Sequence, residues 1–169
     1  PTGGRAILHH REITYSVTAP TGDAGDLRQS YDRINRVLVG GLNRLGVRTE
    51  LAAPSGRATL PGSSPCFDAP SAGELVLDGK KLAGSAQWRS DGALLQHGSI
   101  LVEDDQSPLT DLMVDTRNPV PPPATLAGAL GHSPSPHTLS RALAEAVREL
   151  EDPAAEVLTL EPEVRARAA

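Results

Sequence analysis

The sequence has very few aromatic residues and a single cysteine. Its 169 residues include one Trp, one Phe and two Tyr, so aromatics make up only 2% of the chain. The hydrophobic core that this length allows must therefore be built mainly from Leu, Val, Ile and Ala. One cysteine cannot form an internal disulfide, which is typical of proteins from a reducing compartment. We expect residues 1–169 to form a single domain in the cytoplasm.

Other absences exclude whole classes of function. No apolar run reaches the roughly 18 residues typical of a membrane-spanning helix, and the opening PTGGRAILHH has no apolar signal-peptide core. The formal net charge is −5, so there is no basic surplus for binding nucleic acid phosphates. The 5 histidines lack metal-ligand spacing, and the chain contains no GxxxxGK[ST] phosphate loop. We expect no nucleic acid, membrane or metal partner.

The apolar pattern of the first half predicts a strand, a helix and a short strand. Arg11–Pro20 is rich in β-branched residues and partly alternating, which is typical of a strand. Leu27–Val47 repeats apolar residues at steps of three and four, which indicates a helix. Glycines at 40 and 41 weaken that helix by roughly 1 kcal/mol each, and close packing of the helix on a sheet would explain them. The segment VRTELA indicates a short strand.

The second half predicts a hairpin, a strand and a helix. Two apolar runs flank Asp78-Gly79, a strong two-residue turn signal, and Ala93–Asp104 indicates a strand broken near His97-Gly98. A proline-rich link at 118–124 precedes a helix over Ser135–Glu151, with Ser135 as N-cap and a tail at 152–169. Its expected buried stripe is Leu139, Leu143, Ala146, Val147 and Leu150. Together these elements predict an α+β fold with a mixed or antiparallel sheet packed with helices.

The segment around the single cysteine is a candidate catalytic site. A free thiol has a pKa of about 8.5, and a nearby ammonium lowers that pKa by stabilising the thiolate. Cys66 follows a loop rich in Gly, Ser and Pro, which favours exposure, although a lone cysteine is commonly buried and inert. Lys80 and Lys81 occupy adjacent strand positions, so their side chains point to opposite faces and only one can face a pocket.

Three further segments could line a site, and each also has a purely structural interpretation. The glycines of TGGR (residues 2–5) let the backbone approach a ligand and its arginine offers forked donors, or the segment is a surface turn. LAGSAQ (residues 82–87) supplies small residues, a hydroxyl and an amide to a narrow slot, or lies under a helix. In LLQHGSILV, Gly98 indicates a bulge that could re-aim His97, or His97 is a core imidazole.

These segments, with the amphipathic helix between them, resemble the biotin/lipoate protein ligase superfamily. PTGGRAILHHREITYSV, CFDAPSAGELVLDGKKLAGSAQ and LLQHGSIL are most similar to the octanoyl-[acyl carrier protein]:protein N-octanoyltransferases of lipoate assembly. The resemblance is close over residues 1–104 and loose beyond. It implies that Cys66 is the acyl-thioester nucleophile and Lys81 the pocket lysine, with Lys80 at a position that is typically basic. It implies an acyl pocket lined by Thr2, Gly3, Gly4, Arg5, His9, Gly84, Ser85, Gln87, Gln96, His97, Gly98 and Ser99.

The resemblance also implies a reaction and its partners. An octanoyl group would pass from acyl carrier protein to Cys66, and then to a lysine of a lipoyl domain, in 2-oxoacid dehydrogenases or the glycine cleavage H protein. No ATP, metal or other cofactor is implied, because the incoming thioester is already activated. The alternatives are an ATP-dependent lipoate or biotin protein ligase and a non-catalytic remnant of the fold. Family members carry an arginine pair and a long region before PTGGR, so we expect this chain to be truncated at its N-terminus.

Overall fold

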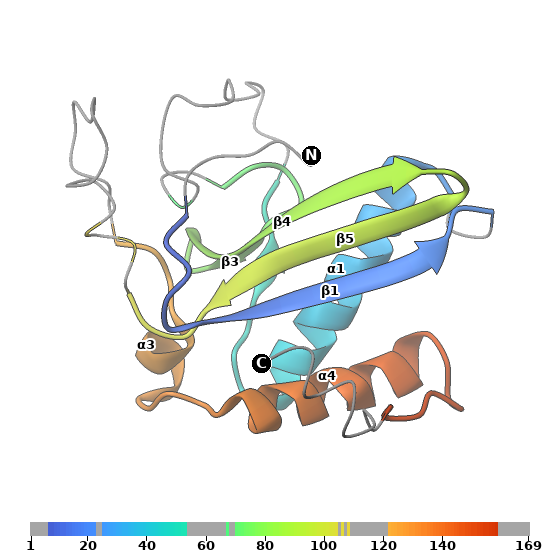
Figure 1. Cartoon of the computed structure of the whole chain (residues 1–169). Coiled ribbons are helices and arrows are strands. Elements are labelled where there is room, and N and C mark those ends of the chain that lie inside the picture. Colours follow the sequence, from blue (N-terminus) through green and yellow to red (C-terminus); the bar gives the residue numbers. More distant parts are fainter. Residues whose placement is uncertain are drawn as a thin grey trace, which may run out of the picture.

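A computed structural model describes residues 7–22, 25–53, 67, 70–104, 106, 108 and 122–158. They form a five-stranded sheet in the order β1-β5-β4-β3-β2, in which every neighbouring pair is antiparallel. Figure 1 shows this sheet with α1 behind it and α4 below. The α+β prediction is confirmed. The strands are β1 Glu12–Pro20, β2 Glu50–Leu51, β3 Leu75–Leu77, β4 Lys80–Ser90 and β5 Ala93–Leu101; the helices are α1 Leu27–Arg44, α3 Leu126–Leu130 and α4 Pro136–Leu150.

Two-residue turns join the three strands β3, β4 and β5. Asp78 and Gly79 have φ angles of 50° and 74°, and Asp91 and Gly92 have φ angles of 51° and 78°. Positive φ at both central residues is the requirement of the tight hairpin turn that Asp-Gly favours. The first hairpin confirms the prediction. The second turn has the same signature and was missed by the sequence analysis.

The predicted break in the strand at His97-Gly98 is wrong. β5 pairs with β1 from Ala93 to Leu101 without a register shift. Gly98 is required there for a different reason, because a Cβ on it would lie 2.3 Å from the Gly84 carbonyl oxygen and 2.8 Å from the Tyr15 ring. The glycine therefore accommodates the close approach of a neighbouring strand and an aromatic ring, not a bulge.

Both long helices begin at side-chain caps. Asp26 accepts a hydrogen bond from the Gln29 backbone N–H, and the Gln29 side chain accepts one from the Asp26 backbone N–H, forming a capping box at the start of α1. α4 begins as predicted, with Ser135 as N-cap and Pro136 at the first helical position. The short helix α3 was not predicted, although Thr125 caps its start and Gly131 ends it with a φ of 75°.

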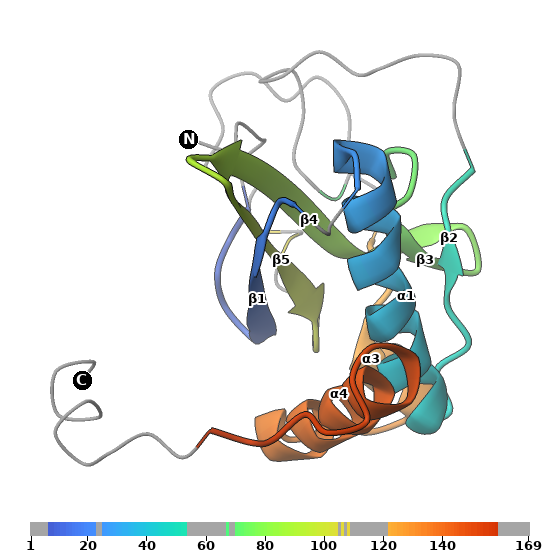
Figure 2. The same ribbon diagram turned by 90° about the vertical axis from the view of Figure 1, so that its right-hand side faces the viewer.

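The glycine pair of α1 packs against α4, not against the sheet as predicted. A Cβ on Gly41 would lie 2.6 Å from Leu143 Cδ2 and 3.2 Å from its Cα. Figure 2 shows α1 along one face of the sheet, with α4 against it. The predicted stripe of α4 is right for the buried Leu139 and Ala146 but wrong for Leu150, which is 48% exposed at the helix end.

The core lies between the sheet and these helices and is almost entirely aliphatic, as the composition predicts. Its largest fully buried apolar side chains are Leu42, Val47, Leu75, Leu82, Ile100, Leu101, Leu126 and Leu139. Within the part of the chain that the structure describes, no helix has both the length and the apolarity to cross a membrane.

Candidate functional site

The two lysines of the hairpin have opposite environments. Lys80 is exposed, whereas Lys81 is only 3% exposed and its Nζ lies 2.8 Å from Glu74 Oε1. The same ammonium lies 5.0 Å from the centre of the Phe67 ring, within cation–π range. Phe67 directly follows Cys66 in the sequence. Strand alternation predicted that only one of the two lysines would face inward, and that lysine is Lys81, the one that the resemblance indicated.

Glu74 is held rigidly around its ion pair. Its second carboxylate oxygen, Oε2, accepts a hydrogen bond from the Ser71 backbone N–H at 2.7 Å. Its backbone carbonyl accepts from the Ala52 N–H at 2.8 Å, next to the start of β3. The preceding carbonyl, of Gly73, accepts from the side-chain amide of Asn35 on α1 at 2.8 Å. The carboxylate is therefore fixed by Ser71 and Lys81, and its backbone segment by Ala52, directly after β2, and by Asn35 of α1.

A buried hydrogen-bond network continues from Asn35 across the helix-facing side of the sheet. The Gln96 side-chain amide donates to Asn35 Oδ1 at 3.0 Å and to the Tyr15 hydroxyl at 3.1 Å. That hydroxyl pairs with Ser85 Oγ at 2.6 Å. Gln87 donates to Gln96 Oε1 at 3.1 Å. Three predicted pocket residues, Ser85, Gln87 and Gln96, are thus brought together here, together with the lysine–glutamate pair.

The network contains both tyrosines of the chain. Burial raises the pKa of Tyr31 to about 12, and the negative charge of Glu74 adds to this effect. Burial also raises the pKa of Tyr15, while hydrogen bonds from Gln96 and Ser85 oppose the change. Both phenols are therefore neutral hydrogen-bonding groups at physiological pH, not bases.

Of the remaining described pocket residues, Gly98 lies on the same face as the network, paired with Tyr15 and Ser85, and the others lie elsewhere. Gly84, His97 and Ser99 alternate with the network residues along β4 and β5, so they belong to the opposite face of the sheet. His9 precedes β1, and its Nδ1 lies 3.0 Å from the carboxylate of Glu12. The motifs GSAQ and QHGS are therefore divided between two faces, because side chains in a strand alternate.

Several predicted residues lie outside the described part of the chain. They include the expected nucleophile, Cys66, and four expected pocket residues, Thr2, Gly3, Gly4 and Arg5. Their assigned roles stay predictions.

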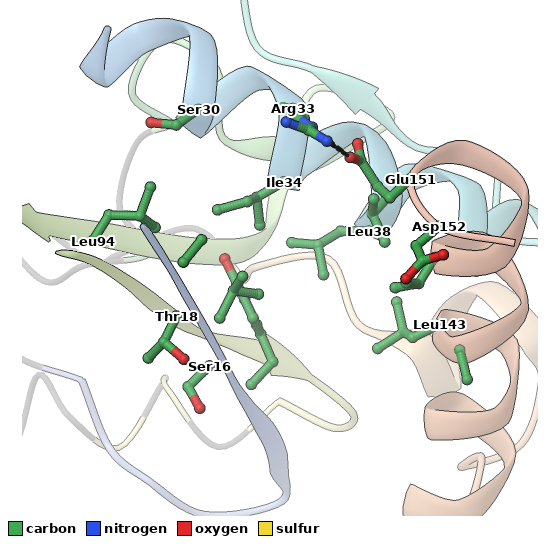
Figure 3. Close-up of a pocket in the computed structure, with 16 residues that line it drawn as sticks. Ser16, Thr18, Ser30, Arg33, Ile34, Leu38, Leu94, Leu143, Glu151 and Asp152 are labelled. Carbon is green, nitrogen blue, oxygen red and sulfur yellow. Dashed lines mark hydrogen bonds and ion pairs between the residues drawn. The ribbon is translucent and has the colours of Figure 1, made fainter. Parts of the chain in front are cut away.

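A separate apolar groove of about 650 Å³ lies between β1, α1 and α4. Ile34, Leu38, Leu94 and Leu143 line it, and the ion pair between Arg33 and Glu151 crosses its rim (Figure 3). Of the predicted site residues that the structure describes, none lines this groove. Neither Lys81 nor Glu74 lines this groove, whereas Tyr15 belongs both to its lining and to the hydrogen-bond network.

Sequence reasoning missed the polar partners that fix Lys81. Glu74 is 7% exposed and Asn35 is fully buried. Each had a signal that could have been used. The acidic residue stands directly before the apolar run LVL at a strand start, and the asparagine falls within the apolar face of the predicted helix. A polar residue at an inward position requires a hydrogen-bonding or charged partner nearby.

Comparison with known proteins agrees with this fold. The chain belongs to the family of the lipoyl protein ligase A/B catalytic domain, whose model matches residues 1–157. The curated relative from Kyrpidia tusciae, named octanoyltransferase LipM, is 50% identical over 116 residues, covering 64% of this chain and 42% of that protein. The octanoyltransferase LipM of Staphylococcus aureus is 43% identical over 121 residues, covering 67% of this chain and 44% of that protein. The chain thus spans less than half the length of these relatives.

Solved structures show the same architecture. The crystal structure of lipoate-protein ligase A bound with ATP matches with a TM-score of 0.63 and 20% identity, covering 93% of this chain and 60% of that chain. At this identity the match establishes the fold alone.

Proposed function

We propose that the protein transfers an octanoyl group from acyl carrier protein, through a thioester on Cys66, to a lysine of a lipoyl domain. The observation that carries the proposal is the buried Lys81 ammonium, 5.0 Å from the ring of Phe67, the residue next to Cys66 in the sequence. The relatives named octanoyltransferase LipM support the choice of acyl group and reaction.

In the first step the Cys66 thiolate attacks the thioester carbonyl of the acyl carrier. A C–S bond forms, the carbonyl electrons move to oxygen, and the tetrahedral intermediate collapses as the phosphopantetheine thiolate leaves and takes a proton from water. A positive charge beside the thiolate favours its formation and also stabilises the developing oxyanion. Lys81 supplies that charge in our proposal.

In the second step a neutral lysine amine of the acceptor attacks the Cys66 thioester. An amide bond forms, the C–S bond breaks, the Cys66 thiolate is regenerated and the amine proton goes to solvent. Covalent catalysis divides one difficult transfer into two easier ones. ATP is not needed, because the acyl group already arrives as a thioester.

The acyl chain would be recognised by burial of its methylene groups, worth about 0.8 kcal/mol each. A pocket that works in this way discriminates neighbouring chain lengths only about 10- to 200-fold per methylene. We expect decanoyl and hexanoyl carriers to react more slowly than octanoyl, without being excluded.

The decisive experiment is intact-mass spectrometry of the full chain after incubation with octanoyl-acyl carrier protein. We expect one octanoyl adduct, located on Cys66 by peptide mapping and absent from Cys66→Ser. A parallel reaction with free octanoic acid and ATP should yield neither acyl-adenylate nor adduct. An unchanged mass with the carrier, or an adduct that persists in Cys66→Ser, rules the proposal out.

The two lysines provide a matched test of thiol activation. Lys81→Ala should slow alkylation of Cys66 by iodoacetamide at neutral pH by about tenfold or more, because an opposite charge nearby lowers a thiol pKa by about 1–3 units. Lys80→Ala removes the same charge from the exposed neighbouring position and should leave the rate unchanged. Equal rates in all three proteins would remove Lys81 from the activating role.

A further inference from the structure

We propose that Glu74 is a positioning residue for acyl transfer, fixing the Lys81 ammonium in the place from which it acts on the Cys66 sulfur. The inference rests on the proposed function and adds to it a residue whose carboxylate does not touch the substrate. It is carried by the ion pair between Glu74 Oε1 and Lys81 Nζ, at 2.8 Å, with side chains that are only 9% and 2% exposed.

A buried lysine needs such a partner. Its ammonium lies at the end of four rotatable methylene groups, so by itself it has no defined position. Removing a charge from water is also costly, and a buried ammonium without a carboxylate is strongly disfavoured. Glu74 meets both requirements, since its carboxylate pairs with the buried ammonium and restrains its end.

Glu74 can do so because it is itself immobilised. The Ser71 N–H holds its second oxygen at 2.7 Å, which leaves Oε1 directed to the lysine. The backbone of the same segment is tied to Ala52 by hydrogen bonds of 2.8 and 2.9 Å, from the Ala52 N–H to the Glu74 carbonyl and from the Gly73 N–H to the Ala52 carbonyl. A movement of the carboxylate would break the Ser71 bond and a movement of its backbone would break the Ala52 bonds, so the ammonium has a fixed anchor.

The surroundings of the ammonium connect this anchor to the reactive segment. The centre of the Phe67 ring lies 5.0 Å from Lys81 Nζ. Phe67 is the residue that follows Cys66 in the sequence. Asn35, fully buried on α1, holds the Gly73 carbonyl from the other side at 2.8 Å. The anchor therefore links α1 and the hairpin to Phe67, the neighbour of Cys66 in the sequence.

The test is the pH profile of Cys66 alkylation in four versions of this chain: wild type, Glu74→Gln, Glu74→Asp and Lys81→Ala. Glutamine keeps the shape but removes the charge that anchors the ammonium. Removing a negative charge alone would lower the thiol pKa, so a midpoint that rises by about one pH unit, as in Lys81→Ala, reports the loss of the ammonium's position. Aspartate keeps the charge on a shorter stem, so its midpoint should fall between those of wild type and Glu74→Gln. This graded order is one that a purely structural role would not produce.

The outcomes separate the two proposals. Suppose that Lys81→Ala shifts the profile but Glu74→Gln keeps the wild-type profile or lowers the midpoint. This result overturns the role of Glu74 and leaves that of Lys81 intact. An unshifted profile in Lys81→Ala overturns thiol activation itself, and the role of Glu74 with it. An aspartate variant indistinguishable from glutamine overturns the requirement for charge.

A double variant, Glu74→Gln with Lys81→Met, serves as the control for misfolding. It replaces the ion pair with neutral side chains of similar length, which buried pairs commonly tolerate. Its far-UV circular dichroism should match wild type, and its alkylation profile should match Lys81→Ala. A wild-type alkylation profile in this folded double variant would overturn the proposal.

Discussion

Two tyrosines lie between the sheet and α1, where their hydroxyls are enclosed by the same cluster that holds Lys81. Tyr15 is 9% exposed and pairs with Ser85, and the Tyr31 hydroxyl points to the Ser85 backbone carbonyl at 3.5 Å. Neither phenol can ionise without placing a negative charge in a poorly solvated space that already contains Glu74. The fold therefore depends on both groups staying neutral.

We predict that stability falls between pH 10 and 12, through Tyr31. Its pKa is about 12 when folded against 10.0 in the unfolded chain. In this window the unfolded chain binds fewer protons, so the free energy of unfolding decreases as pH rises, by about 2 kcal/mol in total. Below pH 10 the Tyr31 hydroxyl keeps its proton in both the folded and the unfolded chain, so its contribution to the free energy of unfolding does not change with pH.

Denaturant unfolding across this pH range, with phenolate absorbance as a direct titration, checks the prediction. The chain has only two tyrosines, so the absorbance reports Tyr15 and Tyr31 alone. Tyr31→Phe should lack the phenolate absorbance transition near pH 12. Its free energy of unfolding should also fall by about 2 kcal/mol less than that of wild type over the same pH range. A wild-type titration centred at pH 10 for both phenols would contradict the burial effect.

At the scale of single residues, the sequence predicted which residues belong to the site better than it predicted what surrounds them. Strand alternation correctly indicated that only one of Lys80 and Lys81 could face inward, because that argument needs only neighbouring positions. The partner, Glu74, lies beyond a hairpin turn and a bulge between Leu75 and Val76, and their combined geometry is not readable from spacing. The resemblance assigned all residues of GSAQ and QHGS to one pocket. Because side chains alternate along a strand, these residues are divided between the two faces of the sheet.

At the scale of elements, the crossing of α1 and α4 depends on one glycine. Gly41 is buried against the Leu143 side chain and backbone, whereas the space beside Gly40 is bounded by the ends of Leu150 and Ala146. Small residues allow two helices to approach closely, and in this protein the approach places α4 beside the groove. The neighbouring Gly40 provides a control within the same helix, because alanine has the same intrinsic helix propensity at both positions.

We predict opposite effects for alanine at these two sites. Gly41→Ala places a Cβ 2.6 Å from Leu143 Cδ2 and 3.2 Å from its Cα, so overpacking should cost about 1–3 kcal/mol. Gly40→Ala meets Leu150 Cδ1 at 3.1 Å, and that half-exposed side chain can move. It should gain up to about 1 kcal/mol from helix propensity. Urea unfolding of both variants checks this, and equal destabilisation would refute the packing argument.

Element boundaries were largely predictable because their signals are local. The strand at Glu12–Pro20, the helix from Leu27, the Asp78-Gly79 turn and the Ser135 cap each depend on a few consecutive residues. Packing partners were not, because they depend on residues distant in sequence. The glycine pair was assigned to the sheet for this reason, and Leu150 was placed in the core although it lies at the end of α4.

On the scale of the whole molecule, helices and sheet share one core. Leu42 of α1, Leu75 of β3, Ile100 of β5 and Leu139 of α4 are all fully buried in the same cluster. Composition predicted its aliphatic character but not its connectivity. A shared core means that no part of it can lose its packing without exposing side chains of the others, so the described elements should unfold together.

We predict that Leu42→Ala destabilises sheet and helices equally, by about 2–5 kcal/mol, because it leaves a cavity at the centre of the core. The single Trp88, 45% exposed on β4, reports the sheet by fluorescence, and far-UV circular dichroism reports the helices. The two unfolding curves should coincide in wild type and shift together in the variant. Leu158→Ala, at a position that is 82% exposed, should change stability by less than about 0.5 kcal/mol. A fluorescence transition that stays in place while the dichroism transition moves would mean that sheet and helices are separate folding units.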